Sequence, residues 1–218
     1  MEQEGLLRAG QAAWRVTLDD VRRRFPRSEA ASLRPDKVRG DHDLNPGFGP
    51  PDALREAAVL VPLVDRVEGP TVIFTQRTAH LTAHAGQISF PGGRRETYDH
   101  SPEDTALRET EEEIGLPRER IEILGRLDTY VTRTGFRVTP VVGMVRPPIA
   151  LVPDPTEVEE VFEVPLTFIL DPDNPKRHSR EFMGGQRHFY VFPYQQRYIW
   201  GATAGMLVNL RDVLREAP

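Results

Sequence analysis

Two runs rich in β-branched residues, at 57–64 and 71–77, carry the clearest strand patterns in the chain. The polar stretch between them contains Gly69 and Pro70, so the pattern predicts a β-hairpin. Further apolar patterns predict strands near 121–131, 136–146 and 159–165, and helices near 102–114 and 202–215. Strands outnumber helices and do not alternate regularly with them. We therefore expect an α+β fold in which a helix packs on a mixed sheet.

The first 52 residues are expected to form an extension that precedes the main domain at 53–218. Five prolines interrupt the polar stretch at 26–52, which predicts an irregular segment. Before it, loosely recurring apolar residues predict an amphipathic N-terminal helix. These residues are Leu6, Leu7, Trp14, Val16, Val21 and Phe25.

Aromatic residues recur near the C-terminal end of the chain, at Tyr190, Phe192, Tyr194, Tyr198 and Trp200. Their alternation predicts one face of a hairpin that contacts the core. The alternative interpretation is a surface that stacks an adenine ring.

The predicted helix at 102–114 has well-defined ends. Ser101 is a favourable N-cap, and Gly115 stands where a left-handed C-terminal cap belongs. The face expected to pack on the sheet comprises Ala106, Thr110 and Ile114, which follow one another at intervals of four.

The opposite face of this helix carries Glu109, Glu112 and Glu113, whose like charges repel at this spacing. Arg108 can neutralise Glu112, and a divalent cation can neutralise the others. Oxygen ligands of this kind suit Mg²⁺ or Mn²⁺, which also bind substrate phosphates. The alternative is a solvated acidic helix surface. The glycine pair in the run 90–93 favours a site, because glycines let a loop approach a ligand closely.

Composition removes several kinds of chemistry and partner. The sequence has no Cys, which excludes disulfides and thiolate sites. Its longest apolar run, 57–64, is too short to span a membrane, and the acidic N-terminus has no apolar run behind it, so we expect a cytoplasmic protein. The net charge of −5 argues against nucleic-acid binding, and a polyanionic substrate would need local arginines or a divalent cation.

Gly93, Asp99 and the run Arg-Glu-Thr-Glu-Glu-Glu-Ile-Gly-Leu at 108–116 resemble the Nudix box, the loop–helix–loop signature of Nudix hydrolases. Three departures stand out: Asp99 replaces a Glu, Thr110 stands at a hydrophobic position, and the second spacer is one residue longer than in the box. The resemblance implies a Nudix-type α/β/α sandwich with the carboxylate helix packed on a mixed sheet. It also implies hydrolysis of a nucleoside diphosphate linked to another moiety.

The resemblance further implies how the site residues act. Glu109, Glu112, Glu113 and Arg108 would form the catalytic set, with Glu109 as the candidate general base. Glu109, Glu112, Glu113 and Glu157 would hold Mg²⁺ or Mn²⁺, with Glu160 as an alternative to Glu157. Arg77, Gly92, Gly93 and Arg94 would bind the substrate.

Several of these residues have plainer alternatives. Arg77 ends a predicted strand just before the glycine loop, where it can bind a phosphate or form an ordinary ion pair. Arg94 and Arg95 can bind phosphate or simply belong to an exposed loop. His80 and His84 are expected to be structural, because their spacing does not match a zinc site.

The segment before the box narrows the resemblance. Phe74–Thr78 followed by Gly86–Gly93 is similar to the corresponding segment of coenzyme A diphosphatases of the Nudix superfamily, and 127–132 and 135–143 are similar as well. Thr82 stands where that subfamily has Arg. The resemblance implies cleavage of coenzyme A to 4′-phosphopantetheine and 3′,5′-ADP. ADP-ribose, dinucleoside polyphosphates or oxidised nucleotides are alternative substrates, a non-catalytic nucleotide-binding module is a second alternative, and a homodimer is an open expectation.

Overall fold

The computed structural model describes residues 16–25, 37–47, 49, 51–80, 85–182 and 184–215, and their strands form a larger and a smaller sheet. Along the larger sheet the order is β1 (Val38–Gly40), β7 (Thr129–Val131), β8 (Phe136–Val145), β2 (Arg55–Val64), β3 (Thr71–Arg77) and β4 (Ile88–Ser89). Three further strands pair with members of this row: β5 (Gly92–Arg94) with β2, β6 (Ile121–Arg126) with β8, and β9 (Val158–Pro165) with β3. Because β2–β8 and β1–β7 are parallel and the other pairs antiparallel, the sheet is mixed, as expected.

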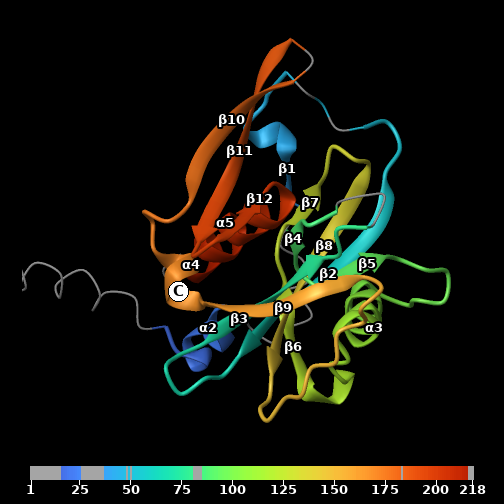
Figure 1. Ribbon diagram of the computed structural model, residues 1–218, viewed down its shortest axis with the longest axis vertical. Helices are drawn as coiled ribbons and strands as arrows, with labels where there is room; N and C mark the ends of the chain where they lie inside the picture. Colours follow the sequence, from blue (N-terminus) through green and yellow to red (C-terminus); the bar gives the residue numbers. More distant parts are fainter. Residues whose placement is uncertain are drawn as a thin grey trace, which may run out of the picture.

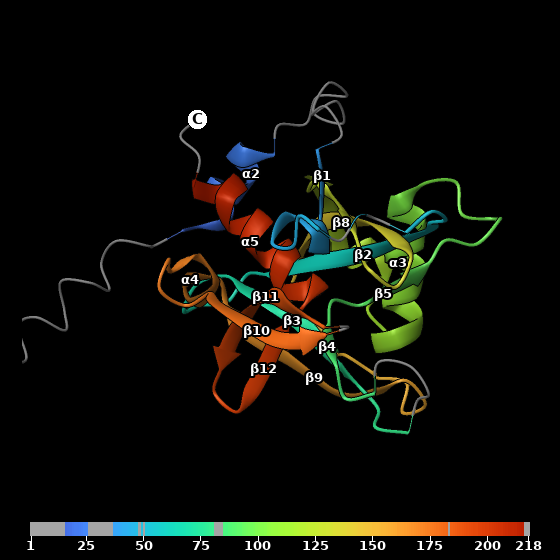
Figure 2. The ribbon, with the colours of Figure 1, turned by 90° about the horizontal axis from the view of Figure 1, so that it is seen from above.

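Helices cover both faces of the larger sheet. On one face lies α3 (Pro102–Ile114), and on the other lie α2 (Leu18–Arg24), α4 (Leu166–Leu170) and α5 (Ala202–Arg215), as Figure 1 and Figure 2 show. Ala106 of α3 is fully buried with Leu60 and Val141 of the sheet, and Ile114 is buried in a neighbouring cluster with Val64. The α/β/α sandwich is therefore confirmed. No helix of the described residues is long and apolar enough to cross a membrane.

The ends of α3 follow the local signals in the sequence. The Ser101 hydroxyl accepts a hydrogen bond from the backbone N–H of Asp104 at 3.2 Å, and Gly115 adopts the left-handed conformation with φ of 64°. Thr110, which stands at a hydrophobic position of the box, donates its hydroxyl proton to the carbonyl of Ala106 at 2.6 Å. Its polar group is thereby satisfied, so that a fully buried threonine fits the packing face.

The smaller sheet consists of β10 (Lys176–Phe182), β11 (Gly185–Tyr194) and β12 (Arg197–Trp200), all antiparallel. The β11–β12 hairpin confirms the strand prediction there, but the expectation of a single aromatic face is wrong. Phe192 lies opposite Ile199 in the core, whereas Trp200 lies opposite Val191 and Tyr198 opposite Pro193 on the other face. The two-residue turn between the strands shifts the alternation by one position.

Two other expectations need correction. Predicted strand 121–131 is interrupted, because β6 ends at Arg126 and β7 begins at Thr129. Between them Asp128 turns to α5, where its backbone N–H donates to the side-chain oxygen of Asn209 at 2.9 Å. The segment 26–52 is not irregular throughout, since it contains β1 and a 3₁₀ helix at Asp41–Asp43. Pairing of β1 with the distant β7 forms this strand, and side-chain periodicity does not show such pairing.

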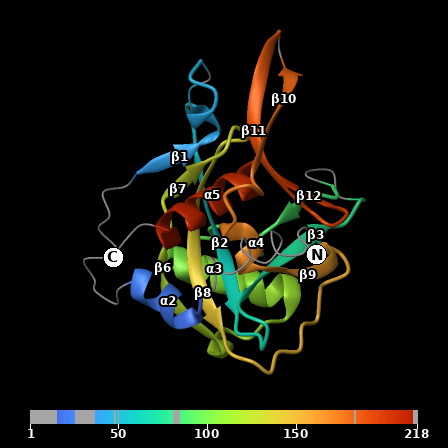
Figure 3. The same ribbon diagram turned by 90° about the vertical axis from the view of Figure 1, so that its left-hand side faces the viewer.

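The N-terminal helix is confirmed over α2 only. Thr17 and Asp20 form a reciprocal capping box at its start, and Val21 and Phe25 are buried. Leu6, Leu7 and Trp14 lie outside the described residues. Figure 3 shows α2 next to α5, on the side of the sheet away from α3.

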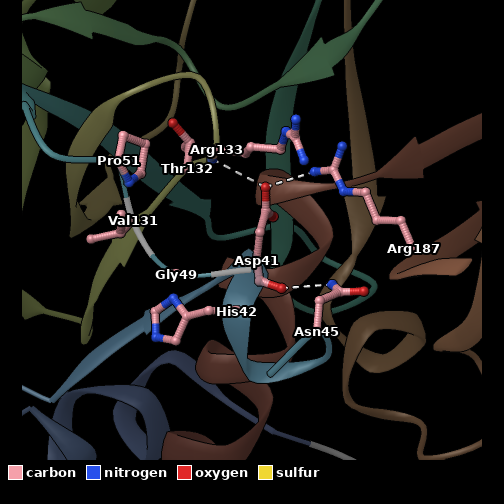
Figure 4. Close-up of a pocket in the computed structure, with 9 residues that line it drawn as sticks. All are labelled: Asp41, His42, Asn45, Gly49, Pro51, Val131, Thr132, Arg133 and Arg187. Carbon is pink, nitrogen blue, oxygen red and sulfur yellow. Dashed lines mark hydrogen bonds and ion pairs between the residues drawn. The ribbon is translucent and has the colours of Figure 1, made fainter. Parts of the chain in front are cut away.

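The carboxylate of Asp41 joins three separate segments of the chain (Figure 4). It accepts a hydrogen bond from the guanidinium of Arg187 on β11 at 2.7 Å and from the backbone N–H of Arg133 at 3.2 Å. Its second oxygen accepts one from the hydroxyl of Tyr130 at 3.0 Å. The pKa of Tyr130 is raised well above its usual range, mainly by burial and to a smaller extent by the negative charge of Asp41. The N-terminal segment is thus fastened to both β7 and β11.

We expect Asp41→Ala to lower the free energy of unfolding by about 1–3 kcal/mol, because Arg187 and the Tyr130 hydroxyl lose a charged partner at a half-buried position. Thermal unfolding followed by circular dichroism measures the effect, which corresponds to a decrease of several degrees in Tm. Glu56→Ala is the matched control, since it breaks an exposed ion pair with Arg137 at 3.4 Å. Equal Tm values for the two variants would contradict the expectation.

Candidate active site

Two glycines on β5 allow α3 to approach the sheet closely. Gly92 and Gly93 pair with Val59 and Ala58 of β2. Gly92 has a φ of 150°, and a Cβ there would lie 2.5 Å from the carbonyl oxygen of Ala58. A Cβ on Gly93 would lie 2.5 Å from the carboxylate of Glu109. A side chain at Gly92 would collide with the β2 backbone, and one at Gly93 would displace the Glu109 carboxylate, which lies directly against the β5 backbone.

Glu113 is a nearly buried carboxylate, with only 5% of its surface exposed. The backbone N–H of Gly92 donates to its Oε2 at 3.3 Å, and Nη1 of Arg77 lies 3.8 Å from its Oε1. Burial raises the pKa of Glu113 to about 8, and the negative charges of Glu109 and Glu157 add to the increase. A cation placed among these groups would therefore stabilise their charged forms.

Glu109 and Glu157 complete this group of carboxylates. Burial raises the pKa of Glu109, and the charges of Glu112 and Glu157 contribute to the increase. Glu157 enters from the loop before β9, where its carbonyl accepts a hydrogen bond from the N–H of Thr78 at 3.0 Å. This bond holds the loop at the end of β3. Glu109, Glu113 and Glu157 thus come from one helix and one distant loop.

Arg77 lies between two of these carboxylates. It is the last residue of β3, and its Nη1 is 3.8 Å from the carboxylates of both Glu113 and Glu157. Its Nε is buried, and no hydrogen-bond partner for it exists in the described part of the chain. The guanidinium therefore holds an ion pair at the site and retains donor capacity.

Arg108 is held by Asp99 through two parallel hydrogen bonds. Its Nε donates to Oδ1 at 3.0 Å and its Nη2 to Oδ2 at 2.9 Å. Arg108 holds the pKa of Asp99 well below its usual range. The remaining Nη1 lies 2.9 Å from both Glu109 and Glu112. Asp99 therefore orients the arginine that neutralises two box glutamates.

The contribution of Asp99 was not evident from box spacing alone. The acid also accepts hydrogen bonds from the Thr105 hydroxyl at 3.0 Å and the Glu96 N–H at 2.9 Å. Its partners are three, six and nine positions away, a spacing that carries no distinctive sequence signal.

Other candidates lie apart from the carboxylate group. Glu112 is mostly exposed, at 59%, and binds Arg108. Glu160 pairs with Arg197 on the α5 side of the sheet, where Phe162 also lies, so it does not reach the site. The side chains of Arg94 and His80 are exposed. Arg95 donates hydrogen bonds to the carbonyls of Asp99 and His100. Thr82 and His84 lie outside the described residues.

The donor set suits a hard divalent cation. Glu109, Glu113 and Glu157 supply only oxygen ligands, and their mutual repulsion with burial raises two of the pKa values. As the side chains stand, no three carboxylate or imidazole groups of the described residues converge on one point. Coordination would accordingly draw the carboxylates together, which the flexible glutamate side chains permit.

We expect Glu113→Gln to stabilise the protein in EDTA at pH 7.5. The folded carboxyl keeps its proton up to about pH 8 and a free glutamate only to about 4.5, so the folded state binds more protons in this window. Stability therefore falls as pH rises through it, and the amide removes that loss. Thermal unfolding should show a gain on the order of 2–4 kcal/mol at pH 7.5, shrinking toward pH 5.

Glu111→Gln is the control for this experiment, because Glu111 is an exposed residue of the same helix that lies 3.7 Å from Arg118. A Glu113→Gln difference that does not vary with pH would contradict the burial argument.

Comparison with known proteins agrees with this geometry. The family model described as NUDIX domain matches residues 54–192. NudL, a Nudix hydrolase of Escherichia coli (strain K12), is 39% identical over 195 residues, covering 89% of this chain and 93% of NudL. NudL of Photorhabdus laumondii is 40% identical over 159 residues, covering 73% and 84%. A Nudix hydrolase structure from M. smegmatis, RenU, has the same fold, with a TM-score of 0.53, 22% identity and coverage of 76% of this chain and 89% of that one. The chain therefore belongs to the Nudix family and is a hydrolase.

Proposed function

We propose that this Nudix hydrolase cleaves the diphosphate of coenzyme A to 4′-phosphopantetheine and 3′,5′-ADP. One observation carries the proposal. The runs Phe74–Thr78 and Gly86–Gly93, which are similar to those of coenzyme A diphosphatases, both contact the carboxylate group. The first contributes Arg77, 3.8 Å from Glu113, and the second the Gly92 N–H, 3.3 Å from the same carboxylate.

Nudix hydrolases generally need a divalent metal ion, and we assign Mg²⁺ or Mn²⁺ to Glu109, Glu113 and Glu157. Glu112, which is exposed and binds Arg108, would turn toward the ion on coordination. When bound, the ion neutralises charge on the diphosphate oxygens and lowers the pKa of a water molecule. Arg108 fixes the position of Glu109 through their 2.9 Å contact.

Glu109 is our choice for the general base. Its partial burial raises its pKa above the ordinary glutamate value, which makes the carboxylate a stronger base toward water. Contact with Arg108 keeps the carboxylate oriented while it is ionised. Proton transfer would take place beside the backbone of Gly93, where no side chain fits.

The substrate diphosphate is assigned to Arg77, Arg94 and the glycine pair. Arg77 presents a guanidinium that can bind two phosphate oxygens at once. Gly92 and Gly93 keep this part of β5 free of side chains, and Arg94 at the end of β5 is exposed. In this assignment the two guanidiniums supply the positive charge that a diphosphate requires.

The first test compares coenzyme A, ADP-ribose, a dinucleoside polyphosphate and an oxidised nucleoside triphosphate, each with Mg²⁺, Mn²⁺ or EDTA. We expect coenzyme A to be cleaved to 4′-phosphopantetheine and 3′,5′-ADP, identified by chromatography, with loss of activity in EDTA. Glu112→Gln and Glu113→Gln should each lower kcat by roughly a hundredfold or more, because each removes a ligand of the ion.

Glu111→Gln serves as the control in this assay as well and should retain wild-type kcat, since Glu111 faces Arg118 rather than the site. Turnover of ADP-ribose or a dinucleoside polyphosphate a hundredfold faster than that of coenzyme A would refute the substrate assignment. Full activity in EDTA would refute the metal-dependent mechanism.

A second test examines Arg77. Because a hydrogen bond to a charged group contributes about 1.5–3 kcal/mol, Arg77→Ala should raise KM for coenzyme A and lower kcat/KM roughly ten- to hundredfold. Arg77→Lys should recover only part of this, since an ammonium keeps the charge but loses the two-pronged geometry. Steady-state kinetics and Tm are measured on the same samples. A lowered Tm with unchanged KM would mean that Arg77 only pairs with Glu113 and Glu157.

A further inference from the structure

One face of the smaller sheet combines aromatic rings with basic side chains. Directly opposed residues share a face, so strand pairing brings together eight of them. They are Lys176, His178, Arg180 and Phe182 of β10, Arg187 and Phe189 of β11, and Tyr198 and Trp200 of β12. The opposite face buries Phe192 and Ile199 in the main core. The aromatic and basic face is therefore turned away from the core; we call it the β10–β12 face.

The rings of this face form a connected row. Nδ1 of His178 and the hydroxyl of Tyr198 share a hydrogen bond of 2.8 Å. His178 and Phe189 have centroids 6.3 Å apart, and Phe189 meets Trp200 edge-on at 5.5 Å. The guanidinium of Arg180 lies 5.3 Å from the centre of the Trp200 ring. Trp200 thus already accepts a flat cationic group over its face, which is the geometry in which an indole also stacks a purine.

Two of the positive charges of the face lack carboxylate partners in the described part of the chain. Within the described ranges, no Asp or Glu forms an ion pair with Arg180 or Lys176, although Lys176 donates to the carbonyl of Asp173 at 2.5 Å. By contrast, Arg187, directly opposite Arg180 on the same face, is paired with Asp41. In a chain with a net charge of −5, an arginine and a lysine without ion-pair partners among the described residues favour an anionic ligand.

This face is close to the catalytic loop. β12 packs beside β4, as Figure 1 shows. Just after Trp200, the hydroxyl of Thr203 donates to the carbonyl of Ile88 in β4 at 3.1 Å. Four residues further on is Gly92, whose N–H contacts Glu113. The strand that carries Trp200 thus lies beside the chain segment that leads into the carboxylate group.

We propose that the β10–β12 face binds the nucleoside half of the substrate, a purine nucleotide that carries an additional phosphate. Trp200 and Phe189 stack the base, and Arg180 and Lys176 bind the additional phosphate. This inference rests on the proposed function, because the 3′,5′-ADP half of coenzyme A combines a purine with a second phosphate. In this proposal the smaller sheet recognises the nucleotide half of the substrate, and the proposed carboxylate ligands of the metal ion come from other elements.

The decisive experiment measures nucleotide binding without catalysis. Isothermal titration calorimetry of the full chain in EDTA compares 3′,5′-ADP with 5′-AMP. We expect 3′,5′-ADP to bind roughly ten- to hundredfold more tightly, as a hydrogen-bonded charge pair would give. Arg180→Ala should remove most of this preference and leave the affinity for 5′-AMP almost unchanged. Arg118→Ala, which removes an exposed arginine on the other side of the molecule, should preserve the preference.

Trp200 is tested by two substitutions. Trp200→Ala should weaken binding of both nucleotides roughly five- to hundredfold through loss of stacking, and Trp200→Phe should restore part of the affinity. Trp200 lies opposite the buried Val191, so Tm is measured for each variant. Arg180 is exposed, and its substitution tests the proposal even if Trp200→Ala does not fold.

Kinetics separate this inference from the proposed function. If coenzyme A is cleaved, its KM should rise in Arg180→Ala while the KM for ADP-ribose, which lacks the additional phosphate, stays the same. Cleavage of coenzyme A with unchanged KM in Arg180→Ala and Trp200→Phe would overturn the inference alone. Binding of 3′,5′-ADP through Arg180 and Trp200, without cleavage of coenzyme A, would support this face and overturn the proposed function.

Discussion

The close packing of α3 against β5 is the constraint on which the site depends. Because Gly92 and Gly93 have no side chains, the helix face that carries Glu109 and Glu113 lies against a strand backbone. Burial at this contact is the main cause of the raised pKa values of both carboxylates. A side chain at Gly92 would collide with the β2 backbone, and one at Gly93 would displace the Glu109 carboxylate, so either change would disturb the packing that buries these carboxylates.

Cationic side chains oppose this accumulation of negative charge from two sides. Arg108, fixed by Asp99, neutralises Glu109 and Glu112 on the outer side of α3. Arg77, at the end of β3, lies between Glu113 and Glu157. The anchored arginine keeps its partners whatever binds, whereas the second has donor capacity left for a substrate. The two arginines therefore contribute differently to the same cluster.

Features of the fold that depend on residues close together in the sequence were predicted from local sequence signals. The caps of α3 depend on residues within a few positions, so Ser101 and Gly115 were predicted correctly. The glutamates were expected on the face opposite to the packing face, whereas Glu113 is nearly buried against β5 and Glu112 is mostly exposed. Contacts between distant segments were not visible: β1 forms only by pairing with β7, and β10 carries almost wholly exposed side chains. The same reason explains why Glu160 was an unsuitable candidate for a metal ligand. Its ion-pair partner, Arg197, comes from a hairpin 37 positions away.

The hydrogen bonds of Asp41 hold the N-terminal segment against the β10–β11 hairpin. Its bonds to Arg187 and to the Arg133 backbone tie β11 to the β7–β8 turn, and Asn45 donates to and accepts from the backbone of His188 nearby. A fragment beginning at residue 53 would keep every carboxylate of the cluster and lose these hydrogen bonds. Its β10–β11 hairpin would then be held only by β12 and by the packing of Phe192 against α5, so that truncation would impair substrate capture while leaving the carboxylates in place.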